Sequence, residues 1–192
     1  MADAVVEKFR PTSGRVTGVI GLALAAAIVA VALIDRDQGI PAYVVWVVLF
    51  IGVLIWAAML RPLVWVTASR LVFRSMLSTI SMPLAAIEQV VVAQVLAVRV
   101  GDRRFVSASI GKPLREQMRR GREDAQTPTE SYGEFVETRI QHLAEEARAQ
   151  AGIARYSDEQ VALADQVHRA WAWPEVAAMA ISAVGFVVSF VV

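Results

Sequence analysis

The densest charge in this chain lies near its middle, where eight basic residues fall within 24 positions beside only two acidic ones, Asp102 and Glu116. The basic residues are Arg99, Arg103, Arg104, Lys112, Arg115, Arg119, Arg120 and Arg122. Guanidinium and ammonium groups gathered in this way attract anions, so the segment is our candidate contact for an anionic membrane surface or a partner protein. The alternative is a solvated flank, because region 123–165 carries ten acidic and three basic residues that can neutralise it.

The other residue types form no recognisable catalytic or metal-binding motif. The only two histidines, His142 and His168, lie 26 positions apart, and only Glu145 and Glu146 lie near the first of them. This spacing is typical of surface histidines rather than of metal ligands. The chain has no cysteine, which excludes disulfides, cysteine-ligated zinc and iron–sulfur clusters. No glycine-rich phosphate loop appears either. We therefore expect no enzymatic activity, no metal and no cofactor.

The composition indicates a membrane protein, because 56% of the 192 residues are apolar, 19% are charged and the mean hydropathy is +0.51. Almost no charge falls in three blocks of 19, 20 and 17 residues, at 16–34, 41–60 and 176–192. At 1.5 Å per residue, a helix of about 20 residues spans the hydrocarbon core of about 30 Å. The blocks therefore predict a transmembrane hairpin joined by the short connector 35–40, and a third spanning helix over 174–192.

Alternatives remain for two of these helices. The first block could be a signal peptide, but it is longer than the usual apolar region and ends in charged residues rather than at a cleavage site. The third is short enough to be re-entrant. Small residues predict packing faces on both helices. They are Gly18, Gly21, Ala25, Ala26 and Ala30 in the first, and Ala178, Ser182, Gly185 and Ser189 in the third.

Basic residues near the helix ends predict the orientation of the chain in a cell membrane. The tail 1–15 carries three of them, the connector has only Arg36 between two aspartates, and Arg61 and Arg70 follow the second block. We therefore expect the N-terminus and the central region on the cytoplasmic side, with the connector and the C-terminus outside. No ionisable residue lies within the three blocks, so an ion or proton pathway lacks its usual marker.

The first half of the central region has the pattern of short β-strands. Six segments of β-branched, aromatic and alternating residues predict an antiparallel sandwich or barrel. They are 63–67, 71–77, 79–82, 87–93, 95–100 and 103–109. The pair Gly101-Asp102 between the last two is typical of a two-residue hairpin turn.

The second half changes to a helical period. Thr127 to Glu130 form a capping box, and an apolar stripe follows it to a predicted helix end near Gly152. The stripe consists of Tyr132, Val136, Ile140, Leu143 and Ala147. A further helix is predicted from Ser157, with one face that includes Val161, Val167 and Trp171, so we expect an amphipathic juxtamembrane helix over 153–173.

Several of these segments together resemble a known family. They are Leu63–Thr67, Arg70–Arg74, Met82-Pro83-Leu84 with Ile87 and Val90, the hairpin Val98–Ser107 and the helical stretch Tyr132–Ile140. They are similar to the bacterial PH-domain proteins of actinobacterial membranes, in which a transmembrane hairpin precedes a pleckstrin-homology-like domain. The resemblance covers roughly 41–150 and implies an antiparallel β-barrel or sandwich closed by a C-terminal helix at 61–152. It implies no known reaction.

We expect an α+β membrane protein whose cytoplasmic PH-like domain acts as a binding or adaptor module for a partner protein or for anionic lipid headgroups. A homo-oligomer is possible, and no nucleic-acid partner is expected, because no nucleic-acid-reading motif accompanies the arginines. The alternative function is a structural subunit of a larger membrane complex, in which the small-residue helix faces form the interface.

Overall fold

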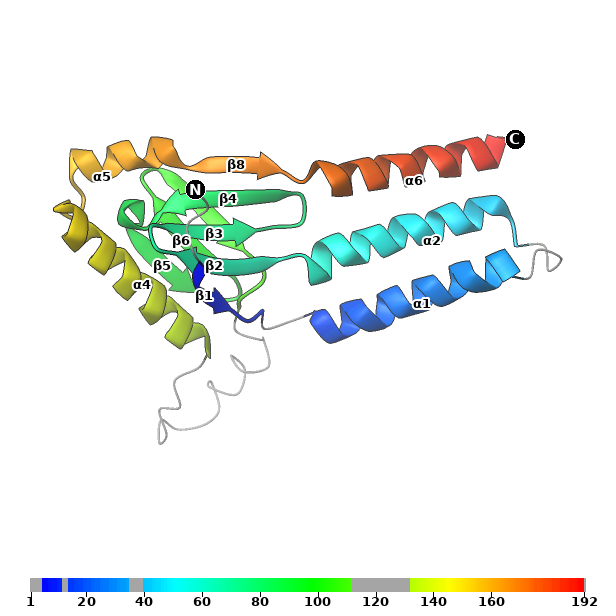
Figure 1. Cartoon of the computed structure of the whole chain (residues 1–192), viewed down its shortest axis with the longest axis horizontal. Coiled ribbons are helices and arrows are strands. Elements are labelled where there is room, and N and C mark those ends of the chain that lie inside the picture. Colours follow the sequence, from blue (N-terminus) through cyan, green and yellow to red (C-terminus); the bar gives the residue numbers. More distant parts are fainter. Residues whose placement is uncertain (1–4, 12–13, 35–39, 112–131, 192) are drawn as a thin grey trace, which may run out of the picture. The chain divides into compact units, whose positions relative to one another are not determined.

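The computed structural model describes residues 5–11, 14–34, 40–111 and 132–191, and these divide into two compact units. One unit is built from apolar helices and the other from two β-sheets with further helices (Figure 1). The connector 35–39, the capping box at 127–130 and the second half of the basic segment lie outside the described residues.

The helical unit contains three long apolar helices. They are α1 (Arg15–Ile34), α2 (Ala42–Ile55), which continues into the π-helix η2 (Trp56–Leu60), and α6 (Trp173–Val191). Each is long and apolar enough to cross a membrane, which confirms the three expected spans by length and composition. Their surfaces are largely apolar and exposed, as expected for helices surrounded by hydrocarbon.

Small residues let these helices approach each other closely. A Cβ atom added at Gly18 would lie 2.9 Å from Met59 Cβ, and one added at Gly21 would lie 3.1 Å from Ile55 Cδ1. On α6, a Cβ added at Gly185 would lie 2.4 Å from the Trp46 ring. The glycines of the small faces expected on the first and third helices therefore pack against α2 and η2, and α2 lies between α1 and α6 (Figure 1). Ala26 and Ala30, which were expected on the same face of the first helix, are exposed.

The larger sheet of the other unit has the strand order β1-β2-β3-β4-β8. The strands are β1 (Val5–Phe9), β2 (Leu63–Thr67), β3 (Arg70–Arg74), β4 (Ser78–Pro83) and β8 (His168–Trp171). Strands β1 to β4 pair antiparallel in sequence order. Val64 and Val66 alternate towards the core along β2, and the Thr67 hydroxyl accepts a hydrogen bond from the Arg70 amide to close the turn to β3.

The smaller sheet is an antiparallel meander of β5 (Gln89–Val92), β6 (Leu96–Val100) and β7 (Arg103–Ser107). Between β6 and β7 lies the two-residue turn expected at Gly101-Asp102, and Gly101 has the positive φ of 54° that such a turn requires. The short helix η3 (Leu84–Ala86) connects the two sheets along the chain.

Helix α4 (Tyr132–Ala151) packs on the sheets through most of the expected apolar stripe, whose first residue, Tyr132, is exposed. Val136, Ile140 and Ala144 are fully buried and join residues of both sheets in one hydrophobic core. The helix ends before Gly152, whose φ is 69°, as predicted.

The N-terminal strand is held to this helix by polar contacts. The Arg139 guanidinium lies 2.8 Å from the Glu7 carboxylate, and this hydrogen bond and the carboxylate charge raise the pKa of Arg139. The Arg10 amide also donates a hydrogen bond to the Tyr132 hydroxyl at 2.7 Å. The tail before the first membrane helix therefore belongs to the sheet unit.

The structure corrects three expectations. In the described part of the chain the two sheets do not close into a barrel, and the larger sheet gains β1 and β8, which the sequence patterns did not predict. The expected amphipathic helix over 153–173 is instead α5 (Asp158–Ala162), then the 3-10 helix η4 (Leu163–Gln166), then β8. The start is as predicted, because Ser157 caps α5 by accepting a hydrogen bond from the Gln160 amide.

Candidate functional site

The β6–β7 hairpin separates the three arginines of the basic segment that the structure describes. Cross-strand partners share a face of a sheet, and Arg99 pairs with Arg104 while Val100 pairs with Arg103. Val100 is fully buried, so Arg99 and Arg104 lie on the outer face and Arg103 belongs to the opposite, core-facing side at the exposed end of the hairpin. The other candidates, Lys112, Arg115, Arg119, Arg120 and Arg122, lie outside the described residues.

Two cross-strand rows cover the outer face of this sheet. The polar row runs Gln89–Arg99–Arg104 across β5, β6 and β7, and the apolar row beside it runs Val91–Ala97–Val106. Between them is a hollow of about 300 Å³, which we call the outer hollow. It is lined by Gln89, Val91, Ala97, Val98, Arg99 and Arg104. Ala97 has the smallest side chain of either row and lies on the central strand, β6. Its small size leaves space between the larger side chains of Val91 and Val106.

The outer hollow carries net positive charge. The Arg99 side chain is 58% exposed, and its Nε lies 3.6 Å from the Glu88 carboxylate. Among the described residues, none forms a hydrogen bond or ion pair with Arg104. Like charges placed directly opposite each other on neighbouring strands destabilise a sheet, so this pair has a cost that an uncharged residue at either position would remove.

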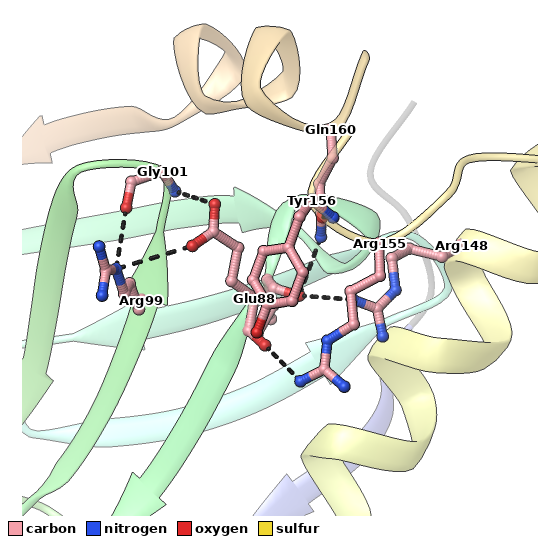
Figure 2. A network of polar contacts seen from close by, with 8 residues as sticks. Glu88, Arg99, Gly101, Arg148, Arg155, Tyr156 and Gln160 are labelled. Atoms are coloured by element: carbon pink, nitrogen blue, oxygen red, sulfur yellow. Dashed lines mark hydrogen bonds and ion pairs between the residues drawn. The ribbon is translucent and has the colours of Figure 1, made fainter. Parts of the chain in front are cut away.

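A network of hydrogen bonds fixes the start of β5 and the tip of the hairpin (Figure 2). The Glu88 side chain is largely buried and accepts a hydrogen bond from the Gly101 amide at 3.1 Å, and Arg99 Nε donates to the Gly101 carbonyl at 3.3 Å. The Glu88 carbonyl accepts from Arg155, whose guanidinium lies 5.2 Å from the centre of the Tyr156 ring. Glu88 thereby orients Arg99 at the edge of the outer hollow.

The neighbouring carbonyl, that of Ile87, is held from α4 and α5. Arg148 of α4, itself buried, donates to it at 3.2 Å, and the Gln160 side-chain amide of α5 donates at 3.2 Å (Figure 2). Every buried side-chain nitrogen and oxygen in the described part of the chain has a partner. The network is therefore a rigid support for the hollow, with no buried polar group left to bind a ligand.

The remaining chemical candidates lie apart from one another. His142 is exposed and lies 3.5 Å from Glu146 one helical turn away, and His168 is exposed on β8. The buried hydroxyls of Ser107 and Ser109 lie 2.8 Å apart and bond each other. Within the described residues, no three histidine, aspartate or glutamate side chains are placed to hold a metal ion.

A second concave region lies within the helical unit, between α1, α2 and the start of α6. This membrane groove has a volume of about 680 Å³, and apart from Glu175 its lining is apolar, with both small and larger side chains. It includes Ala25, Ala26, Ala30, Gly52, Trp56 and Ala178. At one end lies the Glu175 carboxylate, paired at 2.6 Å with the buried Arg61 guanidinium.

Sequence reasoning identified the arginines but missed the outer hollow, the Glu88 network and the membrane groove. The two-residue turn does contain the signal for the arginine pair, because it sets Arg99 opposite Arg104. Comparison of the chain with protein-family models, with curated proteins and with solved structures finds no match.

Proposed function

We propose that this protein is a membrane-anchored, non-catalytic binding module that docks on an anionic surface through the outer face of β5-β6-β7. The observation that carries the proposal is the exposed pair of arginines opposite each other at the outer hollow. Repulsion between the two guanidinium groups destabilises the sheet, and an anion that binds between them reduces this repulsion.

The proposed architecture is a PH-like domain held by three membrane spans. Two observations support this interpretation. The two sheets share one core with α4, which follows β7 in the sequence. The sequence also resembles the bacterial PH-domain family over 41–150. The basic residues of the tail and those after α2 support a cytoplasmic position for the sheet unit and the N-terminus. An anionic leaflet would then attract each arginine that reaches it by about 1 kcal/mol.

The test uses the full chain in nanodiscs of neutral phosphatidylcholine. We expect it to float with vesicles that contain phosphatidylglycerol, and to do so less as salt is raised. Reversal of Arg99 and Arg104 to glutamate should weaken this binding at least about tenfold, because each arginine contributes about 1 kcal/mol.

A partner protein is tested in native membranes. Crosslinking and pull-down with the wild-type chain should capture a fixed partner that the Arg99 and Arg104 double variant does not capture. If the variant matches the wild type in both assays, or if neither assay detects binding, the proposal is wrong.

The membrane groove favours a second candidate function, a structural subunit of a larger membrane complex. Helix α2 packs on both α1 and α6, and the three helices leave an apolar concavity whose lining includes Ala25, Ala26, Gly52 and Ala178. Small residues in such a surface let another transmembrane helix approach closely. Purification in mild detergent should then yield a defined oligomer or complex that Ala26→Phe, which fills the groove, disrupts. A monomer in the wild type contradicts this candidate.

A further inference from the structure

We infer that the outer hollow is a phosphate-binding site, in which Arg99 and Arg104 hold the phosphate group of a monoester and the apolar row contacts the adjoining part of the same molecule. The inference rests on the proposed function and names the chemistry that the docking face recognises.

The donors suit a phosphate group rather than a single carboxylate. Arg99 and Arg104 are direct cross-strand partners, so their side chains start from Cβ atoms about 5 Å apart and can reach the same anion. Each guanidinium is a planar fork that can give two parallel hydrogen bonds to an oxyanion. One guanidinium can donate to both oxygens of a carboxylate, whereas two guanidinium groups provide enough donors for a tetrahedral group with three or four oxygens. The Gln89 amide, in the same row, adds a further donor.

The charge balance leaves the pair able to bind an anion. Among the described residues, Glu88 has the carboxylate that pairs with Arg99, 3.6 Å from its Nε, and this carboxylate already accepts a hydrogen bond from the Gly101 amide. This contact orients the Arg99 side chain through its Nε. In the described part of the chain Arg104 has no carboxylate partner, and its side chain lines the hollow in the same row as Arg99.

The shape of the hollow limits what can enter it. Its volume of about 300 Å³ is at the lower end for a small-molecule site, and Ala97 forms its floor. Val91 and Val106 are 39% and 46% exposed on either side of Ala97, so an apolar surface continues directly from the polar row. A phosphate that carries an apolar or glycerol-like group fits both rows at once. Such a phosphate ester can come from a lipid headgroup or from a free metabolite.

The hairpin offers a matched pair of variants, because Arg103 and Arg104 are neighbours of equal charge on opposite faces. The full chain is placed in phosphatidylcholine nanodiscs. Binding of free glycerol 3-phosphate is measured by calorimetry, and binding of phosphatidylcholine vesicles with and without phosphatidic acid by flotation. Arg104→Gln should reduce affinity about tenfold or more, since it removes a hydrogen-bonding charge, whereas Arg103→Gln should change it less than about twofold.

Two further variants separate shape and fork geometry from charge. Ala97→Leu fills the hollow without changing any charge, and we expect it to reduce affinity as much as Arg104→Gln does. Arg104→Lys keeps the charge but not the fork, and should also weaken binding. This second variant keeps the test decisive if Ala97→Leu does not fold, which hydrogen exchange in β5, β6 and β7 would reveal.

The results assign the source of the phosphate or overturn the inference. Binding of glycerol 3-phosphate indicates a free phosphate ester, and binding of phosphatidic acid alone indicates a lipid headgroup. Equal losses in Arg103→Gln and Arg104→Gln, with no effect of Ala97→Leu, would mean a diffuse electrostatic surface and would refute the phosphate site while leaving the proposed function intact. Absence of binding to both probes, with phosphatidylglycerol vesicles or an acidic partner still bound, refutes the site in the same way. Loss of those interactions as well contradicts the proposed function.

Discussion

Replacement of Gln160 by methionine tests whether the polar network supports the sheet unit. The Gln160 side chain is only 1% exposed and serves three groups on two segments. Its amide nitrogen donates to the carbonyls of Ala85 and Ile87 at 3.1 and 3.2 Å, and its oxygen accepts from the Tyr156 amide at 2.7 Å. Tyr156 has a φ of 61°, a conformation that non-glycine residues rarely adopt, so this last bond also holds a strained residue.

Methionine has nearly the same size but neither donates nor accepts strong hydrogen bonds. The Ile87 carbonyl keeps its bond from Arg148, whereas the Ala85 carbonyl and the Tyr156 amide lose the partner that Gln160 provides. A buried polar group without a partner costs about 1–3 kcal/mol. Both groups are only partly buried, so we take the low end for each and expect a total loss of about 2–3 kcal/mol.

Hydrogen exchange of the full chain in nanodiscs measures this loss where it occurs. Amides of β5 and α5 should exchange about 30- to 150-fold faster in Gln160→Met, because each 1.4 kcal/mol is a factor of ten. The matched control is Gln141→Met on α4, since the Gln141 side chain bonds only the exposed Glu145 at 3.4 Å. If the two variants exchange alike, Gln160 does not hold these segments together and the reasoning from the network is wrong.

Three glycine substitutions should separate close packing from backbone conformation, with the thermal unfolding of the full chain in detergent as the measurement. Gly111→Ala places a Cβ 2.0 Å from the Gln94 carbonyl oxygen, and we expect a loss of about 3 kcal/mol because backbone must move. Gly185→Ala meets the Trp46 ring at 2.4 Å and should cost about 1–3 kcal/mol by separating α2 from α6. Gly152→Ala has no atom within 4 Å but needs a φ of 69°, so it should cost only about 1 kcal/mol, and an order in which it costs the most would contradict the packing argument.

Elements specified by local pattern could be predicted from the sequence. The three membrane helices follow from uninterrupted apolar blocks, and α4 follows from its stripe and from Gly152. The strand Leu63–Thr67 has the predicted bounds, since its β-branched residues lie between short turns. In each case the signal and the structure involve the same few residues.

Elements that depend on a distant partner could not be predicted. Strand β8 was expected to be helical because Val161, Val167 and Trp171 share a helical face, yet the segment pairs with β4, nearly 90 positions earlier. Strand β1 has five residues, and its pairing with β2 crosses the whole hairpin of α1 and α2. Strand propensity depends on neighbouring strands more than on the segment itself, so tertiary context decides such elements.

The candidate site was predictable only as far as the register of the hairpin. A strand exposes alternate residues on opposite faces, so a shift of one position would place Arg103 at the outer hollow and turn Arg104 to the other face. The two-residue turn prevents this shift, and Glu88 reinforces it by bonding the Gly101 amide at the tip. The same carboxylate lies beside Arg99, so one buried side chain both sets the register and orients an arginine. Charge counting along the sequence cannot distinguish Arg103 from Arg104, whereas this geometry assigns them to different faces.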